Sequence, residues 1–238
     1  TTPDGGADLP APENTRLYFL TGAQHGPARF PTKAVNGQLP DNPLEYVWTM
    51  RALLAGMINW VKNGTTPPAS QYPRLSDHTL VASTALKFPA IPGVTSPKSI
   101  APAREDGKPR PLLVGEVDAD GNEIAGVRTA ELLVPMATFT GWNFRTPSTG
   151  GADQIVFLLG SSIPLPKTAA ERAAKHDPRK SVAERYASKQ VYIDQVHGVV
   201  DKLVRGGYLL PEDVQHAVER ADAYWGAARP ISSAGGAR

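Results

Sequence analysis

Residues 16–26 read RLYFLTGAQHG and place a histidine directly after a short apolar run. The run at 17–20 is brief, partly aromatic and followed by Gly22, which favours a buried strand over part of a helix. His25 lies in the tight loop that comes next. Loops at the C-terminal ends of strands bind ligands in open α/β sheets, and imidazole suits proton transfer near neutral pH. The stretch therefore predicts an α/β fold with His25 as a candidate catalytic base; a histidine that only completes the loop is the alternative.

A helix is predicted next, from about Asn42 to Asn63. Asn42 can cap it, Pro43 suits its first turn, and Glu45 has a capping-box-like spacing. Gly64 should end it. Apolar side chains recur along this segment at helical spacing, which predicts that most of the helix packs against a sheet. These side chains are Leu44, Val47, Trp48, Met50, Leu53, Leu54, Ala55, Met57, Ile58, Trp60 and Val61.

Five stretches of the chain carry a resemblance to a known family. Together they resemble the C-terminal part of a large bacterial family of alpha/beta hydrolase domain proteins, over nearly the whole chain. The histidine loop and the helix after it also resemble the tannase and feruloyl esterase group. The stretches are RLYFLTGAQHGP at 16–27, NPLEYVWTMRALLAGMINWVKNGTTPP at 42–68, FPAIPGV at 88–94, VDADGNEIAGVRTAELLVPMATFTGWNFR at 117–145 and GSSIPLPKTAAERAAKHDPRKSVAERY at 160–186.

The resemblance implies a fold class and a reaction. The fold would be the C-terminal portion of an α/β-hydrolase fold, with its last strand, histidine loop and helix, a loop-rich extension and C-terminal helices. The reaction would be hydrolysis of a carboxylic ester through an acyl-enzyme, with His25 as the triad histidine. In such folds the chain order of the triad is serine, acid, histidine, so His25 is the triad member that this chain would supply.

The nucleophile itself is not recognisable in the sequence. No G-x-S-x-G is present: the segment 160–162 lacks the trailing glycine, and Ser148 lacks the leading one. We therefore expect the serine and its acid upstream of Thr1 or on a partner chain, as in the C-terminal part of a longer serine esterase. The main alternative is a non-catalytic binding or structural chain. A minor alternative is an N-terminal threonine hydrolase, in which Thr1 attacks and its own amine is the base.

Four residues are candidates for contacting a small-molecule ester. Arg29 and Phe30 follow His25 closely enough to line a pocket mouth. By resemblance, Trp142 and Asn143 belong to a segment that returns toward the active site, where Trp142 would give an apolar wall and Asn143 an amide that orients the ester. The alternatives are ordinary loop packing for Arg29 and Phe30, and a core position for Trp142.

The chain divides by composition into four predicted parts. Residues 1–66 would form the final βα unit with the histidine loop. The proline-rich segment 67–165 would be a loop-rich extension with short strands that covers the pocket as a lid. Residues 166–228 would be C-terminal helices that pack on the core, and 229–238 a tail.

Local signals place several elements within these parts. The turn residues at 118–122, DADGN, resemble a calcium loop, but the glycine position favours a hairpin without metal. Helices are predicted at 168–175 and at 211–225. Between them, a capping box at 181–184 should open one long helix that Gly206 ends.

Composition limits the partners. The chain has 238 residues, a net charge of +2 and 41% hydrophobic residues, which fits a globular protein without a nucleic-acid partner. No apolar run approaches the roughly 20 residues of a membrane span. The absence of cysteine excludes disulfides and thiolate chemistry. It does not assign a compartment, so a periplasmic, secreted or other location stays open. Neither a cofactor nor a metal site is predicted.

Overall fold

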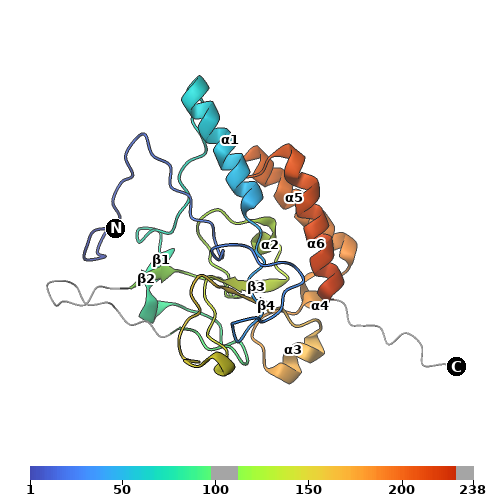
Figure 1. Cartoon of the computed structure of the whole chain (residues 1–238). Helices are drawn as coiled ribbons and strands as arrows, with labels where there is room; N and C mark the ends of the chain where they lie inside the picture. The colour runs from blue at the N-terminus through green and yellow to red at the C-terminus, as the bar shows by residue number, and fades with distance from the viewer. Residues whose placement is uncertain (98–111, 229–238) are drawn as a thin grey trace.

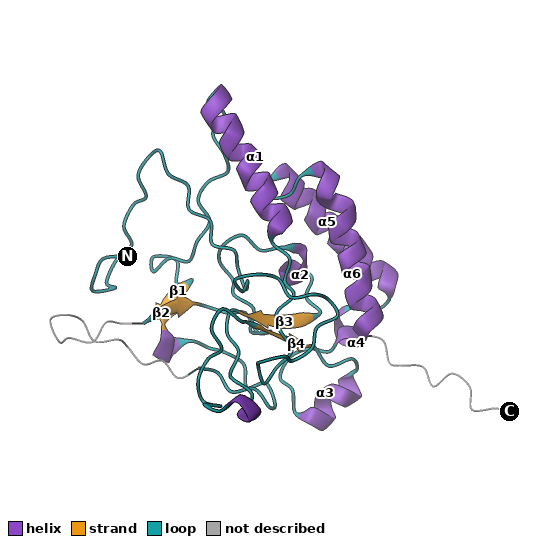
Figure 2. Ribbon diagram, in the orientation of Figure 1, coloured by secondary structure: helices purple, strands orange, loops and turns teal. Residues whose placement is uncertain are grey.

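The computed structural model describes residues 1–97 and 112–228 (Figure 1). Short helices and strands are set among long loops, which makes the fold mixed α/β (Figure 2). The helices are α1 Val47–Asn63, α2 Ala130–Leu133, α3 Ala169–Lys175, α4 Val182–Arg185, α5 Lys189–Arg205 and α6 Val214–Ala228, with 3-10 turns at Ser83–Ala85, Pro147–Thr149 and Pro211–Asp213. The predicted tail at 229–238 lies outside the described residues.

The described strands form two antiparallel pairs. In the first pair, β1 (Leu80–Ala82) lies beside β2 (Leu113–Gly115). In the second, β3 (Ala137–Thr140) lies beside β4 (Ser161–Pro164), with Phe139 opposite Ser162. All four residues of β3 are buried, so this pair lies at the centre of the molecule.

The core lies between the β3–β4 pair and the C-terminal helices. α5 and α6 run side by side and α2 lies under them (Figure 1). Their inward faces follow the 3.6-residue period of a helix. Burial of each large apolar side chain contributes roughly 1.5–3 kcal/mol. The fully buried members include Leu132, Phe139, Tyr192, Val196 and Val200.

One buried ion pair ties the second strand pair to the segment that follows α3. Arg179 and Asp177 lie 2.7 Å apart, and both side chains are almost fully buried. The Arg179 guanidinium also donates to Thr138 Oγ1 on β3 (2.9 Å) and to the Ile163 and Pro164 carbonyls on β4. Burial disfavours the charge on Asp177, but the hydrogen bonds from Arg179 outweigh it and hold the pKa of that carboxyl below its usual range.

The C-terminal helices differ from the prediction at one place. α3 is capped by Thr168, and the capping box of Ser181 and Glu184 is present, as predicted. The expected single helix from 181 is nevertheless two helices, since α4 ends after one turn and Ser188 caps α5. The backbone of Tyr186 is extended, its side chain is buried, and its hydroxyl donates to the Pro135 carbonyl (3.0 Å). This tertiary contact interrupts the helix.

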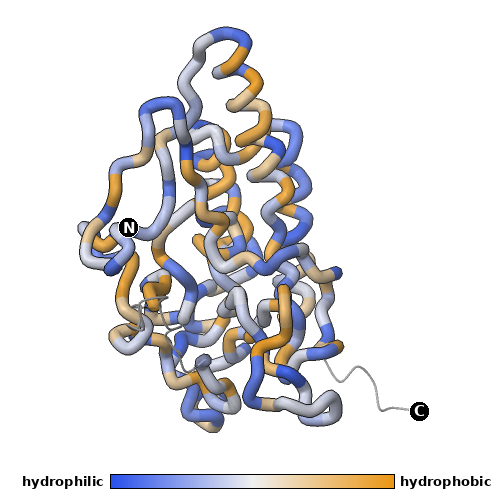
Figure 3. The backbone as a smooth tube through the Cα atoms, turned by 60° about the vertical axis from the view of Figure 1, so that its left-hand side comes forward, coloured by the Kyte–Doolittle hydropathy of each residue, from blue (hydrophilic) through white to orange (hydrophobic). Residues whose placement is uncertain are grey.

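The predicted end of α1 is confirmed, whereas its predicted start and its predicted burial are wrong. Gly64 ends it in the left-handed conformation, with φ 71°. The helix begins at Val47 rather than directly after Asn42, whose Nδ2 donates to carbonyls of other loops. Only Thr49 and Ala52 of α1 are buried, so the prediction of a helix packed mostly against a sheet is wrong for this chain. α1 projects from the body, and its hydrophobic residues are visible along it in Figure 3.

The predicted strand at 17–20 is a paired extended segment rather than a regular strand. Tyr18 bridges Gln71 and Leu20 bridges Val127, both in parallel. Leu17 and Phe19 are exposed, so the prediction that this segment is buried is wrong. The turn at 118–122 does join an antiparallel bridge between Val117 and Glu123, which confirms the hairpin.

Candidate active site

The loop that carries His25 rests on a network of buried polar groups, which we call the loop network: Gln24, Asn42, Thr140, Asn143 and Gly160. Gln24 Oε1 accepts from the Gly160 N–H (2.7 Å) and from the Asn42 N–H (3.3 Å). Asn42 Nδ2 donates to the carbonyls of Gly22 (2.7 Å) and Thr140 (2.9 Å). These bonds satisfy backbone groups that would otherwise be buried without partners. They fix the loop on both sides of the histidine.

The side chain of His25 is not part of this network. It is exposed, while the His25 carbonyl accepts a hydrogen bond from the Tyr46 hydroxyl just before α1. None of the residues 1–97 and 112–228 forms a hydrogen bond with the imidazole. The loop thus presents a proton-transfer group on a fixed backbone, and both ring nitrogens are open to a partner.

Asn143 holds the loop network together from the other side. It is fully buried, and its Nδ2 donates to the carbonyls of Leu39 (2.9 Å) and Gly160 (3.3 Å) while its Oδ1 accepts from the Leu39 N–H (3.2 Å). The amide is therefore already used within the protein. We interpret Asn143 as a residue that positions loops rather than one that contacts an ester.

Trp142 is next to Asn143 in the sequence and lines an apolar cavity of about 290 Å³. Its ring lies edge-on to Phe88 and Phe144, with centroids 5.7 and 6.0 Å apart. The cavity and the histidine loop share a wall, because Gly141 lies against the Ala23 carbonyl. The segment that carries Trp142 thus contacts the loop that carries His25.

Glu123 connects the cavity to the histidine loop. It lines the cavity, and its Oε2 accepts a hydrogen bond from the Gly22 N–H at 2.8 Å. Burial raises the pKa of this carboxyl, and the bond from Gly22 only partly offsets that effect.

The chain resembles a known protein family over most of its length. The model of the family described as "Alpha/beta hydrolase domain" matches residues 2–219. The chain belongs to the alpha/beta hydrolase domain family. Comparisons with curated proteins and with solved structures gave no significant match. Family membership indicates a hydrolase. It does not identify the substrate or the catalytic residues of this alpha/beta hydrolase domain.

Two of the candidate residues lie elsewhere in this alpha/beta hydrolase domain. Phe30 packs on the Tyr224 ring of α6, with centroids 4.3 Å apart, and lies under the Arg220 guanidinium. Arg29 is exposed. The structure therefore places Phe30 against the core, and neither Phe30 nor Arg29 is among the described residues that line the cavity.

The serines of the incomplete motifs do not form a site with His25. Ser162, the serine at the nucleophile position of a motif that begins at Gly160, is buried in β4 opposite Phe139. Ser148 is on the 3-10 turn at Pro147–Thr149, and Thr1 is exposed, so neither has the buried setting of an activated nucleophile.

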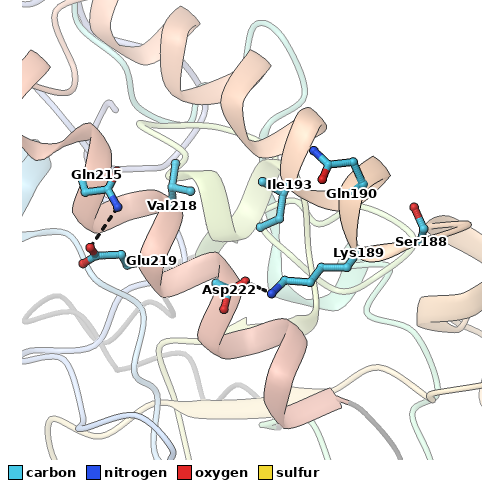
Figure 4. Close-up of a pocket in the computed structure, with 8 residues that line it drawn as sticks. All are labelled: Ser188, Lys189, Gln190, Ile193, Gln215, Val218, Glu219 and Asp222. Carbon is cyan, nitrogen blue, oxygen red and sulfur yellow. Dashed lines mark hydrogen bonds and ion pairs between the residues drawn. The ribbon is translucent and has the colours of Figure 1, made fainter.

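A hollow of about 660 Å³ between α5 and α6 is lined by groups that bind one another (Figure 4). Lys189 pairs with Asp222, and Gln215 donates to Glu219 (3.0 Å). It contains none of the predicted site residues. Within the described part of the chain, no group of three or more potential ligands could hold a metal ion, and no helix is long and apolar enough to cross a membrane.

Sequence reasoning missed the residues that support the histidine loop. Gln24 and Glu123 lie in segments with no helical or strand period, so no pattern marked them as buried. The one usable signal was position, because Gln24 directly precedes His25. Asn42 was recognised as a cap, and its Oδ1 does accept from the Leu44 N–H, but its contacts with Gly22 and Thr140 depend on the tertiary fold.

Proposed function

We propose that this chain is the C-terminal part of a bacterial serine hydrolase that acts on carboxylic esters through an acyl-enzyme. His25 is its general base and acid. The observation that carries the proposal is an exposed imidazole on a loop fixed by the buried loop network, in a chain of the alpha/beta hydrolase domain family. A fixed backbone with a free imidazole is what a triad histidine requires when the serine and the acid come from outside the segment.

In this mechanism, His25 accepts the proton of the serine hydroxyl as its oxygen attacks the ester carbonyl. It then donates that proton to the leaving alcohol and finally activates the water that hydrolyses the acyl-enzyme. A carboxylate on the nucleophile-bearing part fixes the tautomer of the imidazole. Trp142 forms an apolar wall beside the reacting group.

Two unpartnered surfaces support a docking role for the nucleophile-bearing part. The first is α1, on which Val47, Met50, Leu54, Met57, Ile58 and Val61 are all exposed, Val61 at 81%. Such a continuous apolar helix face usually marks an interaction site.

The second surface is the open edge of the segment 17–21. Its hydrogen bonds run through Leu17, Phe19 and Thr21 to Gln71 and Val127. Neither the Tyr18 N–H nor the Leu20 N–H has a hydrogen-bond partner within the described residues. An apolar segment with one free edge is a template for another strand. We propose that the nucleophile-bearing part adds a strand here and covers α1.

The first test concerns the nucleophile. Native mass spectrometry of the protein as its organism makes it, after reaction with a fluorophosphonate probe, should find the probe on a serine of the same polypeptide or of a chain that stays bound. If no labelled serine accompanies the chain, the hydrolase proposal is wrong and a non-catalytic binding chain is favoured.

The second test concerns His25. In that preparation, His25→Ala should reduce p-nitrophenyl butyrate turnover by at least about 10³-fold, because triad members act as a unit. The melting temperature should not change, since the imidazole has no described partner. His197→Ala removes an exposed histidine from α5 and is the matched control, with unchanged turnover. Normal turnover of the His25 variant would refute the assignment.

A further inference from the structure

The cavity beside Trp142 has an unusual distribution of polarity. Its described lining is mainly apolar and includes Leu86, Phe88, Val114 and Trp142. Glu123 is the one ionisable side chain among the described residues that line it. At about 290 Å³ the cavity is near the lower end of the range for small-molecule sites, about 300–1,000 Å³. It is therefore sized for a small ligand with an apolar body and one polar group.

The carboxyl of Glu123 has one oxygen without a donor. Oε2 is bound by the Gly22 N–H, and Oε1 has no hydrogen bond with any described residue. Oε1 lies against Gly115, another residue of the cavity wall, so closely that a Cβ there would be 2.9 Å from it. The free oxygen is thus at the cavity surface. No described residue forms an ion pair with this carboxyl.

A carboxylate in this position favours a cationic ligand. Burial has removed part of its hydration, and no basic side chain is found among the described residues that line the cavity. An unpaired buried charge is costly until an opposite charge binds it. Phe88 and Trp142 add two aromatic rings to the same wall, and such rings attract organic cations through their π faces.

We propose that this cavity binds a small primary amine with an aromatic or branched alkyl body. The ammonium group pairs with Glu123 Oε1, and the body lies against Phe88 and Trp142. The inference does not depend on the hydrolase proposal, because binding requires neither a nucleophile nor His25. If both hold, the shared wall at Gly141 places the amine next to the reacting group.

Calorimetric titration of the purified chain with phenethylamine tests the proposal, with 2-phenylethanol as the uncharged analogue. Phenethylamine should bind at least about tenfold more tightly than 2-phenylethanol, in keeping with hydrogen bonds to charged groups. Glu123→Gln keeps an oxygen for the Gly22 N–H and removes the charge. It should abolish the preference for the amine and leave binding of the alcohol unchanged.

Two further variants keep the result interpretable. Glu219→Gln removes an exposed carboxylate outside the cavity and should leave both affinities unchanged. Gly115→Ala places a methyl group against Oε1 and should weaken amine binding without altering the charge. Equal affinity of the wild-type chain for the two ligands would overturn the proposal. So would an amine preference that survives in a folded Glu123→Gln variant.

Discussion

The side chain of His25 is free while its backbone is fixed, and the contrast comes from its neighbours. Gln24 and Asn42 use their amides to bind backbone groups of other loops, and Gly160 can lie beside the Thr140 carbonyl only because it lacks a Cβ, which would be 2.0 Å from that oxygen. These polar groups gain hydrogen bonds in place of water. The position of the His25 backbone therefore depends on buried side chains from other loops.

The ionisation of Glu123 should make the stability of the chain depend on pH. Its pKa is raised in the folded chain, so the ionised carboxylate destabilises the folded state at neutral and higher pH. As the pH falls through the range between the raised value and the usual one near 4.5, the folded state takes up a proton first and the penalty disappears.

We therefore expect Glu123→Gln to melt a few degrees higher than the wild-type chain at pH 8, a shift typical of about 1 kcal/mol. The difference should vanish as the pH is lowered toward 4.5. Melting curves followed by circular dichroism at several pH values measure this difference. An unchanged difference across the series would mean that the carboxyl is well hydrated in the folded chain.

Among the elements, those with local signals were predictable and those that depend on contacts were not. Thr168, Ser181 and Gly64 mark helix ends through caps that involve only a few neighbouring residues, and all three were visible in the sequence. The break before α5 was not, because it depends on the contact of Tyr186 with the distant Pro135 carbonyl. The histidine loop was found from its glycines, but the residues beneath it come from distant loops.

The β3–β4 pair depends on Arg179, which the sequence did not single out. Arg179→Ala would leave Asp177 buried without its counter-ion and would remove the bonds to both strands. Loss of one partner of a buried ion pair costs about 3–5 kcal/mol. Urea unfolding should show this loss, whereas Arg205→Ala, at an exposed position in the last turn of α5, should change stability by less than about 0.5 kcal/mol.

The pH dependence of this pair has the opposite sign to that of Glu123. The pKa of Asp177 is lowered in the folded chain, so its stabilisation is complete above its usual pKa and is lost as the pH falls through the lowered value. The difference in stability between the wild-type chain and Arg179→Ala should therefore shrink in acid. A difference that stays constant or grows in acid would show that the pair does not stabilise the strands.

At the scale of the whole molecule, α1 contributes little to the core of this chain and leaves an apolar face exposed. An apolar stripe normally covers a core, yet here the core lies between the β3–β4 pair and the C-terminal helices, and α1 contributes to it mainly at its base. The hydrophobic period of α1 was read correctly from the sequence. The sequence could not show what covers that stripe, because the hydrophobic period of a helix carries no information about the surface that packs on it.

This arrangement predicts that charges on α1 will separate folding from association. Met57 and Val61 are exposed at 51% and 81%, so the double variant Met57→Lys, Val61→Lys should change the free energy of unfolding by less than about 0.5 kcal/mol. Association with the nucleophile-bearing part should be lost, because two ammonium groups would have to be buried at the interface. Native mass spectrometry measures association and urea unfolding measures stability. Asn59→Lys is the control: Asn59 is also exposed on α1 but lies outside the apolar stripe by helical spacing, so this variant should still associate. A double variant that unfolds would mean that α1 is packed within this chain, and one that still associates would place the partner on another face.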